Sequence, residues 1–357
     1  MKVEAIDLSK RFDKYLAVDN VNLSIESSKV LSVLGPSGCG KTTLLKLIAG
    51  LVPSDKGSVK FDGVDVTRTP PQKRGIGFVF QSLTLFPNLT VEGNVAFPLD
   101  ARGWSYESIK TRVRELLGLV RLEGLEKRYP RELSGGQQQR VAIARALAAE
   151  TKLLLLDEPL ASLDATLRGD LLAEIKNLQR NLGITTIYVT HDQSEAFAIS
   201  DKIAVMFEGK IEALGETFEI YMNPPTERVA RFVGATNVLT GRVEKLESGT
   251  AILRLGKNSI SIATKLPLSI GQKIKVLARP EGLLIEEKAS DSTFEGAIEN
   301  VLFRGDRVQL HVRTEFGLLE SLVRDPSRYS ELLGRRGRPV LLRMDPKFVI
   351  VLPEKDT

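Results

Sequence analysis

The 357-residue chain has a single cysteine and no long hydrophobic run. One cysteine excludes an internal disulfide and suits a reducing compartment. A membrane-spanning helix needs about 18 uninterrupted apolar residues, and no stretch of the sequence approaches that length. The amino terminus, MKVEAIDLSKRF, is too charged for a secretory signal. We therefore expect a globular protein that would reach any membrane through a partner.

A strong charge of one sign is also missing. Lysine and arginine number 50 against 45 aspartates and glutamates, which gives a net charge of +5. The densest basic cluster is RRGR at 335–338, and the β-rich carboxy-terminal region lacks an aromatic series on which bases could stack. This balance is typical of a solvated surface. We therefore expect no nucleic-acid partner.

One glycine-rich stretch organises the rest of the chain. Residues 35–43 read GPSGCGKTT, after a short apolar run at 29–34 and before a run with helical spacing at 44–50. Strand, glycine loop and helix form the context in which a GxxxxGKT motif binds phosphate. The glycines let successive N–H groups point inward, and the helix N-terminus and a lysine add positive charge. The sequence therefore predicts a nucleoside triphosphate site.

Residues of this loop receive separate predicted roles. Lys41 supplies the full positive charge for the β- and γ-phosphates, and the Thr42 hydroxyl is a predicted Mg²⁺ ligand, because Mg²⁺ is usually held by few protein oxygens plus phosphate and water. Cys39 is interpreted as a small filler, although a thiol beside the phosphates would confer sensitivity to alkylation. The predicted nucleotide contacts in the loop are Gly35, Ser37, Gly38, Cys39, Gly40, Lys41, Thr42 and Thr43.

The segments that follow indicate an α/β fold. Strand-like runs alternate with helical segments, and residues 88–150 are mostly helical. The run KLLLL at 152–156 is continuously apolar, as expected for a central parallel strand, and Asp157 and Glu158 follow it. Ligands bind at the carboxyl ends of such strands. We expect Asp157 to help to hold Mg²⁺ and Glu158 to orient or deprotonate an attacking water.

A second candidate anion site lies at LSGGQ, residues 133–137. Ser134 is placed to cap the helix predicted for 138–149, and Gly135 and Gly136 let the backbone approach an anion closely. Taken alone, the pentapeptide could be a simple helix start. Beside a phosphate loop, it predicts a second phosphate-binding helix terminus in the same chain.

These motifs together resemble the ATPase subunit of an ABC transporter, over about the first two thirds of the chain. The match consists of the phosphate loop, LSGGQ, the carboxylate pair, Gln81, SLD at 162–164 and His191. The resemblance implies that Gln81 senses Mg²⁺ and the attacking water, so that it is also a metal contact. It implies that His191 contacts the γ-phosphate and supports Glu158, and that Asp164 lies at the nucleotide.

In this family the signature of one subunit closes over the ATP at the phosphate loop of another, in a head-to-tail dimer. The resemblance therefore implies a homodimer that holds two ATP, with Ser134, Gly135, Gly136 and Gln137 contacting the partner's nucleotide. Phe12 matches the position whose ring stacks on adenine, and Tyr15 is the second choice.

The segment after Gln81, residues 82–97, resembles the part of the helical subdomain that receives a cytoplasmic helix of a transmembrane permease. Leu85 and Phe86 are equally compatible with the core of that subdomain. Gly93 departs from the family pattern, since relatives usually carry glutamate there in a TVxENV sequence. This departure concerns coupling to the permease and not ATP binding.

The carboxy-terminal region has a different character. From 240 to 353, short alternating segments recur between glycines, with almost no helical period. Residues 240–244 are similar to 295–299, and 277–281 are similar to 342–346, which indicates two small barrel halves. The region resembles the accessory domain of importer ATPases in the maltose, polyamine, sulfate and ferric-iron group. There the barrels help to join two subunits and sometimes receive regulatory signals.

The sequence thus predicts an α/β P-loop NTPase of the ABC type (1–235, with a helical subdomain at about 88–150), followed by an all-β OB-like, or TOBE, domain (236–357). We expect the ATP- and Mg²⁺-dependent hydrolase of a binding-protein-dependent importer, peripheral at the cytoplasmic face of the membrane. It would work with a permease and, indirectly, an extracytoplasmic substrate-binding protein.

The alternative is a soluble ABC ATPase that acts on ribosomes or nucleic acid. It is disfavoured by the single ATPase unit and by the short distance between Lys41 and Ser134, which leaves no room for a long coiled coil. The transported substrate is not encoded here, because the permease and the binding protein select it.

Overall fold

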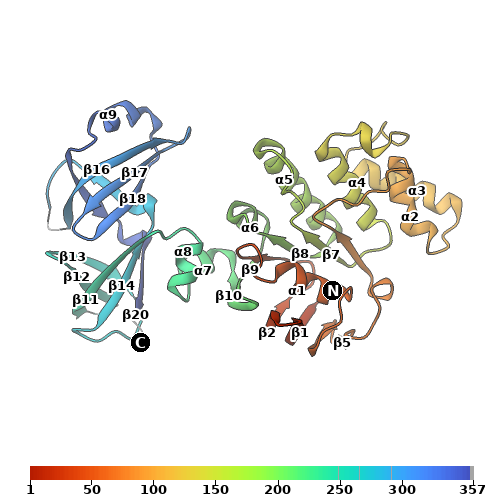
Figure 1. Cartoon of the computed structure of the whole chain (residues 1–357), viewed down its shortest axis with the longest axis horizontal. Helices are drawn as coiled ribbons and strands as arrows, with labels where there is room; N and C mark the ends of the chain where they lie inside the picture. Colours follow the sequence, from red (N-terminus) through yellow and green to blue (C-terminus); the bar gives the residue numbers. More distant parts are fainter. Residues whose placement is uncertain (248, 265, 291, 354–357) are drawn as a thin grey trace. The chain divides into compact units, whose positions relative to one another are not determined.

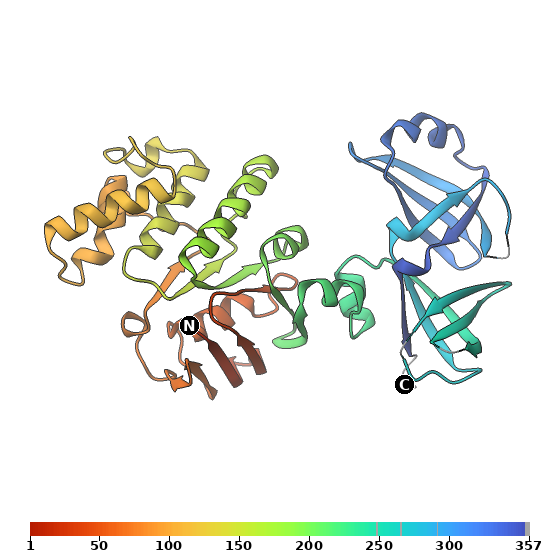
Figure 2. The same cartoon turned by 180° about the vertical axis from the view of Figure 1, so that it is seen from behind.

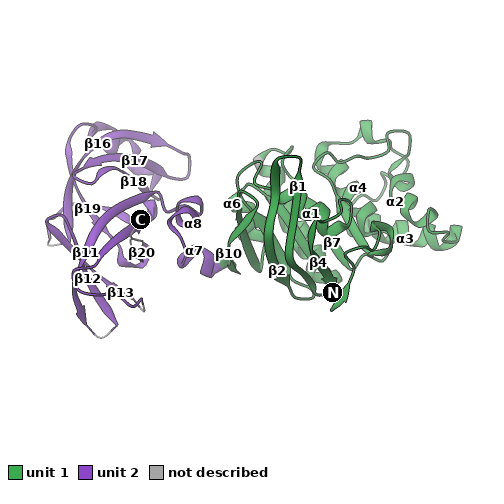
Figure 3. Cartoon of the chain, turned by 60° about the horizontal axis from the view of Figure 1, so that its bottom comes forward, with its two compact units in different colours: residues 1–217 green, residues 218–357 purple. Residues whose placement is uncertain are grey.

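The computed structural model describes residues 1–353 except 248, 265 and 291, so residues 354–357 of the predicted second domain lie outside the described residues. The chain divides into two units, Met1–Thr217 and Phe218–Thr357 (Figure 3). None of the helices in the described part of the chain is long and apolar enough to span a membrane.

The division falls before the boundary predicted at residue 235, because two short helices are attached to the second unit. They are α7 (Thr217–Met222) and α8 (Glu227–Phe232). The buried guanidinium of Arg279 donates to the carbonyl oxygens of Tyr221 and Val233, and it stacks on the Tyr221 ring. Lys275 forms an ion pair with Glu227 at 2.6 Å. These contacts join the helices to the β-rich region. They link residues that are distant in the sequence, so no local pattern predicts them.

Two sheets form the framework of the first unit (Figures 1 and 2). An antiparallel sheet has the order β2-β1-β4-β5, and a six-stranded sheet has the order β10-β9-β3-β8-β7-β6, in which only β10 is antiparallel to its neighbour. The strands are β1 (Val3–Phe12), β2 (Tyr15–Ile25), β3 (Val30–Leu34), β4 (Lys56–Phe61), β5 (Val64–Asp65), β6 (Ile76–Val79), β7 (Leu153–Asp157), β8 (Thr185–Thr190), β9 (Lys202–Phe207) and β10 (Lys210–Glu216). The parallel core confirms the predicted α/β class.

The helices of the first unit follow the predicted pattern closely. The region 88–150 contains three of them, and the others alternate with strands of the parallel sheet. They are α1 (Lys41–Ala49), α2 (Val91–Asp100), α3 (Tyr106–Leu119), α4 (Gly135–Leu147), α5 (Ala165–Leu182) and α6 (Gln193–Ile199). Gly50 ends α1 in the left-handed conformation, as predicted for a glycine C-cap.

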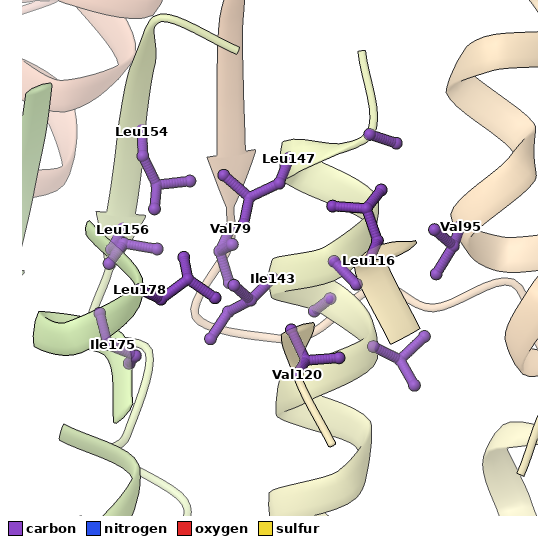
Figure 4. Close-up of a cluster of buried hydrophobic side chains, with 14 of the residues drawn as sticks. Val79, Val95, Leu116, Val120, Ile143, Leu147, Leu154, Leu156, Ile175 and Leu178 are labelled. Atoms are coloured by element: carbon purple, nitrogen blue, oxygen red, sulfur yellow. The ribbon is translucent and has the colours of Figure 1, made fainter. Parts of the chain in front are cut away.

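The central strands are buried along their whole length, because helices cover both faces of a parallel sheet. On one face, Leu154 and Leu156 of β7 pack in a cluster with Ile143 of α4 and Leu178 of α5, and side chains of α3 extend this cluster (Figure 4). Truncating such a leucine to alanine typically costs about 2–5 kcal/mol. This packing fixes the carboxyl end of β7, where Asp157 stands.

The second unit consists of two five-stranded antiparallel sheets, in the orders β13-β12-β11-β14-β20 and β15-β19-β16-β17-β18. A short helix, α9 (Tyr329–Gly334), is inserted in the second half. The strands are β11 (Asn237–Glu247), β12 (Thr250–Leu255), β13 (Asn258–Ala263), β14 (Lys273–Ala278), β15 (Leu283–Glu286), β16 (Thr293–Phe303), β17 (Val308–Thr314), β18 (Gly317–Val323), β19 (Pro339–Met344) and β20 (Val349–Pro353).

The two sheets exchange their fifth strands. After β14 the chain makes a short 3₁₀ turn at Pro280–Gly282 and enters β15, which pairs with β19 of the other sheet. After β19 it makes the same kind of turn at Pro346–Phe348 and enters β20, which pairs back with β14. The sequence similarity of 277–281 to 342–346 marks these equivalent turns. The predicted duplication is therefore confirmed, but each half is completed by a strand from the other.

Two glycines support the same equivalence. Gly241 in β11 and Gly296 in β16 occupy corresponding places in the similar segments 240–244 and 295–299. A Cβ added at Gly241 would lie 2.6 Å from a methyl of Leu255, and one at Gly296 would lie 2.6 Å from a methyl of Val312. Both strands need glycine where a neighbouring strand crosses closely, which is typical of strongly coiled small barrels.

Candidate active site

The phosphate loop leaves β3 and enters α1, as its sequence predicts. Gly35 is required by packing, because an added Cβ would collide with the carbonyl oxygen of Met206. Gly40 has φ 106°, and an added Cβ there would collide with the carbonyl oxygen of Ala17. Gly38 also has positive φ (79°) but borders open space. The glycines thus hold the loop against the sheet and leave its tip, with Ser37, exposed.

The start of α1 has the positive charge and the open amides that a phosphate needs. Gly40 stands at the N-cap and provides no side-chain hydrogen bond. Lys41 is buried, and its ammonium donates to the carbonyl oxygens of Gly35 (2.8 Å) and Pro36 (2.9 Å). An ammonium held among carbonyl dipoles at a helix N-terminus is poised for an anionic ligand.

Cys39 fills space inside the loop. Its side chain is buried in the core cluster beneath the loop, and burial raises the pKa of the thiol above its ordinary value. A buried neutral thiol is a poor target for alkylation, since the thiolate is the reactive form. The filler interpretation agrees with this geometry, and the expected sensitivity to alkylation does not.

An oxygen-rich pair lies below the loop. The Thr42 hydroxyl donates to Asp157 Oδ1 at 2.8 Å, and Thr43 follows on the same helix start. Asp157 is almost fully buried at the end of β7, and this burial raises the pKa of its carboxyl, while the hydrogen bond from Thr42 opposes the rise. A divalent cation would offset the free-energy cost of burying the charged form of this carboxylate. Two hard oxygen donors beside a phosphate cradle fit Mg²⁺, which takes its remaining ligands from phosphate and water.

Three predicted residues converge at the carboxyl ends of neighbouring strands. Gln81, Glu158 and His191 follow β6, β7 and β8, which are adjacent and parallel in the sheet. Glu158 Oε2 accepts from Gln81 Nε2 at 3.3 Å and lies 3.2 Å from His191 Nδ1. Glu158 has φ 45°, an uncommon conformation for a residue other than glycine. A carboxylate between an amide and an imidazole can accept a proton from water and keep its orientation.

The signature helix is closed on itself. The Ser134 hydroxyl accepts from the Gln137 N–H at 3.3 Å, and the Gln137 side chain accepts from the Ser134 N–H at 2.9 Å. Gly135 packs on Leu163, whereas Gly136 borders open space. In the described part of the chain, no hydrogen bond of Ser134 or Gln137 reaches the phosphate loop. The structure therefore confirms the predicted cap but does not bring the two anion sites together within one chain.

Asp164 has a local partner. Its carboxylate caps α5 by accepting from the N–H groups of Thr166 (3.1 Å) and Leu167 (3.0 Å), and the residue is exposed. A cap of this kind stabilises the helix start by about 1 kcal/mol. Its predicted contact with a nucleotide stays a prediction.

The two aromatic candidates for adenine both lie at the turn between β1 and β2. Phe12 is 45% exposed, with the Lys10 ammonium 5.5 Å from its ring centroid. The Tyr15 hydroxyl donates to the carbonyl oxygen of Gly38 at 2.7 Å, a contact that sequence reasoning missed. The Phe12 ring is thus partly exposed beside Lys10, whereas the Tyr15 hydroxyl is held by the phosphate loop.

The segment 82–97 combines core and surface residues. Leu85 is partly buried against the core of the helical subdomain. Phe86 is 36% exposed, and its ring centroid lies 4.4 Å from that of Phe97, which is 46% exposed. Arg145 lies over the Phe86 ring and donates to the carbonyl oxygen of Thr84. Leu85 and Phe86 were both compatible with the subdomain core or with a permease contact. In the structure, Leu85 packs against the core, and Phe86 belongs to an exposed aromatic surface.

Comparison with known proteins shows the family of the chain. Residues 18–161 match the family model described as ABC transporter, and residues 276–352 match the TOBE domain. The spermidine/putrescine import ATP-binding protein PotA of Thermotoga maritima is 41% identical over 334 residues, which cover 92% of this chain and 91% of that protein. The chain belongs to the family of ABC transporter ATP-binding proteins.

Other members of the family are similarly related. The sulfate/thiosulfate import ATP-binding protein CysA 2 of Chromobacterium violaceum is 46% identical over 314 residues, which cover 86% of this chain and 83% of that protein. Among solved structures, the dimeric MJ0796, a bacterial ABC transporter cassette, superimposes with a TM-score of 0.55 and 34% identity, over 60% of this chain and 98% of that one. The protein is therefore an ABC ATPase with an OB-like TOBE domain.

Proposed function

We propose that this chain is the ATP-hydrolysing subunit of a binding-protein-dependent importer. The observation that carries this proposal is the position of Glu158 between Gln81 and His191, beside the Thr42–Asp157 pair. The relatives are named as import ATP-binding proteins, some for spermidine and putrescine and one for sulfate and thiosulfate. A small polyamine or an oxyanion is thus the class of cargo that the relatives suggest, and a separate permease would select it.

In the proposed reaction, the exposed tip of the phosphate loop and Lys41 hold the phosphates of ATP, and Phe12 stacks on adenine. Thr42 and Asp157, with Gln81 at the edge, would hold Mg²⁺, which neutralises charge on the phosphates when bound. Glu158 accepts a proton from the attacking water, and His191 orients Glu158 and donates toward the γ-phosphate.

The self-capped signature supports a proposed head-to-tail homodimer. Residues 134–137 and Asp164 are exposed or partly exposed, and within the described part of the chain no hydrogen bond joins Ser134, Gln137 or Asp164 to the phosphate loop. The related cassette MJ0796 is described as dimeric. We propose that each signature completes the site on a second copy, so that two ATP are enclosed between two chains.

The proposed permease contact lies at residues 82–97, where Phe86 and Phe97 form an exposed pair beside Arg145. An aromatic pair with a cation is suited to an apolar helix that carries a few polar groups. This contact would place the protein at the cytoplasmic face of the membrane, where an extracytoplasmic binding protein acts on it only through the permease.

The first test is the substitution Glu158→Gln in the full chain. It removes the proton acceptor and keeps the shape, so we expect ATP binding to persist while kcat falls about a thousandfold. Glu107→Gln, on the exposed first turn of α3, is the matched control and should leave both quantities unchanged. Undiminished hydrolysis by the Glu158 variant would overturn its role as the base.

The second test concerns the partner. Purification of the tagged chain from detergent-solubilised membranes should recover a multi-spanning permease, and Phe86→Ala should weaken that recovery without lowering the basal ATPase rate. Recovery of ribosomes or nucleic acid in place of a permease would favour the alternative class of soluble ABC ATPase.

A further inference from the structure

A partly buried polar cluster joins the segment before Asp164 to the segment that carries His191. Its centre is Arg168, in the first turns of α5. The guanidinium donates to the carbonyl oxygen of Leu163 at 2.9 Å and to Asp192 Oδ2 at 3.2 Å. Its third nitrogen, Nε, lies 3.6 Å from Glu195 Oε1 and has no hydrogen-bond partner in the described part of the chain. One side chain thus touches both segments.

Glu195 anchors this cluster in the core. Its side chain is 6% exposed, and its Oε2 accepts from the hydroxyls of Tyr188 and Thr190, each at 2.8 Å. Burial, followed by the Glu195 carboxylate, raises the pKa of Tyr188 well above its ordinary value, so Tyr188 stays a neutral donor. A buried carboxylate needs a cation or several donors, and here Arg168 is the nearby cation.

His191 is fixed from both sides by members of the same cluster. The Thr190 hydroxyl, which donates to Glu195, also accepts from the Asp192 N–H at 2.9 Å. Asp192, which receives Arg168, caps α6 through the N–H groups of Ser194 and Glu195. The residues on each side of His191 therefore belong to the network that Arg168 contacts through Asp192 and Glu195. A displacement of the Leu163 carbonyl would be transmitted through the guanidinium to Asp192.

We infer that Arg168 is a positioning residue, which sets the orientation of His191 toward Glu158 according to the position of the Leu163–Asp164 segment. Because Asp164 is exposed and is proposed to meet the second copy of the chain, Arg168 links the closing of the dimer to the assembly of the hydrolytic site. This inference rests on the proposed function, in which His191 supports Glu158.

The geometry explains why an arginine is needed. A guanidinium presents its donors in a fixed planar fork, so it can engage a backbone carbonyl and two carboxylates at once. A lysine keeps the charge but offers a single nitrogen at the end of a flexible chain. Arg168→Lys is therefore the sharpest variant, since it preserves a cation next to buried Glu195 and removes the fixed link between the two segments.

We expect Arg168→Lys to lower kcat for ATP about tenfold or more in the full chain, because small errors in catalytic geometry have large effects on rate. The KM for ATP and the affinity for a fluorescent ATP analogue should change less than about twofold. Arg180→Lys, at an exposed position of the same helix, is the matched control and should leave all three unchanged. A kcat within about twofold of wild type would overturn the inference.

A spectroscopic readout separates positioning from general loss of structure. The chain has two histidines, His191 and His311, so ring-labelled protein gives two histidine signals. In Arg168→Lys the His191 signal should shift, and the His311 signal, from β17 of the second unit, should stay as an internal reference. A fall in kcat with an unchanged His191 signal, or a joint loss of nucleotide affinity and melting temperature, would assign Arg168 a merely structural role and overturn the proposal.

Two further variants keep the result decisive. Glu195→Gln removes the buried charge under the guanidinium with little change of shape, and it should reproduce the same split between kcat and KM if Arg168→Lys folds poorly. His191→Ala tests the proposed function itself. Full turnover by His191→Ala would overturn the role of His191 and the inference with it. Normal turnover by Arg168→Lys beside an inactive His191→Ala would overturn only the inference.

Discussion

Two helix N-termini, those of α1 and α4, are both predicted phosphate contacts, but the fold equips them differently. The start of α1 has no side-chain cap, and Lys41 lies beneath the loop that leads into it. The start of α4 has a complete capping box, in which Ser134 and Gln137 satisfy each other's backbone amides. Unpaired N–H groups at a helix start must find a partner in side chains, water or ligand. The start of α1, the open end, therefore has no side-chain cap, whereas the start of α4, the closed end, is capped within its own chain.

The glycines at the two ends also differ in what requires them. At Gly40, positive φ and a close backbone oxygen leave no room for a side chain. At Gly136 the backbone is helical, and an added Cβ would meet nothing within 4 Å. The first glycine is demanded by the fold. The fold would accept a side chain at Gly136, so we infer that glycine is needed there for contact with a partner.

The largest expected effect separates these two glycines. Gly40→Ala should lower the free energy of unfolding by about 3 kcal/mol or more, because strain at positive φ adds to a collision with the backbone of Ala17. Gly136→Ala should leave it unchanged or raise it by up to about 1 kcal/mol, since alanine is the better helix former. Urea unfolding of both variants measures the difference, and equal destabilisation would contradict the idea that the fold requires only the first glycine.

Gly136→Ala should nevertheless lower the ATPase rate, which a steady-state ATPase assay measures.

Removal of the cation from the open end comes next. Lys41→Ala should weaken the binding of an ATP analogue to the single chain about a hundredfold, or about 2.7 kcal/mol, since the ammonium is the full positive charge at the cradle. Equilibrium titration at low protein concentration, where dimers are few, measures this loss. Lys110→Ala, at an exposed position of α3, is the control. Unchanged affinity in Lys41→Ala would show that the phosphates bind elsewhere.

A smaller effect is expected at the closed end. Ser134→Ala removes the cap hydroxyl and should lower the free energy of unfolding by about 1 kcal/mol. The affinity of the single chain for nucleotide should stay at the wild-type value, while turnover, for which we propose that the second copy is needed, should fall. The same titration and an ATPase assay decide this. A loss of single-chain affinity in Ser134→Ala would contradict the assignment of the two ends to different copies.

The smallest change in the free energy of unfolding is predicted at the start of α8, where no phosphate contact is predicted. Lys275 and Arg231 hydrogen-bond Glu227 and lower the pKa of its carboxyl. The resulting stability is present above the unfolded-state pKa of about 4.3 and is lost as pH falls through the lower folded-state pKa. Glu227→Gln should therefore cost about 0.5–1 kcal/mol at pH 7 and progressively less below about pH 4.

The control for this pH dependence is Glu247→Gln. Glu247 forms an exposed ion pair with Lys245, with just over half of the carboxylate side chain accessible. Its removal should not change unfolding measurably at either pH. If Glu227→Gln and wild type differed equally at pH 7 and pH 3, the charged form of Glu227 would not be the source of the stability.

Much of the first unit was predictable because its signals are local. Helix starts at Ser134 and Asp164 follow from side chains that reach their own backbone within a turn. The convergence of Gln81, Glu158 and His191 was also predictable, since the carboxyl ends of parallel strands meet at one edge of a sheet. The hydrogen bond from Tyr15 to Gly38 was not, because nothing in a turn of β1–β2 specifies contact with a loop more than twenty residues later.

The Arg168 cluster shows the same limit. Arg168 follows Asp164 by one helical turn, which places it near the start of α5, but its partners Asp192 and Glu195 come from another helix. Their meeting depends on how α5 packs against α6, and side-chain spacing along the sequence does not encode that packing. One sequence signal could have indicated that Arg168 has acidic partners elsewhere. It is an arginine near a helix start, where the helix dipole favours an acidic residue.

By itself, the sequence determined the phosphate loop, the order of strands and helices, the carboxylate pair at the end of a buried strand, and the duplication in the β-rich region. Each of these is expressed in short-range periodicity or in a compact motif. The tertiary structure decided the exchange of β15 and β20 between the two sheets, the burial of Arg279 against α7 and α8, and the network around Arg168. The physical reason is that these features join residues distant in sequence, whose pairing is selected by the packing of the whole unit and not by any local preference.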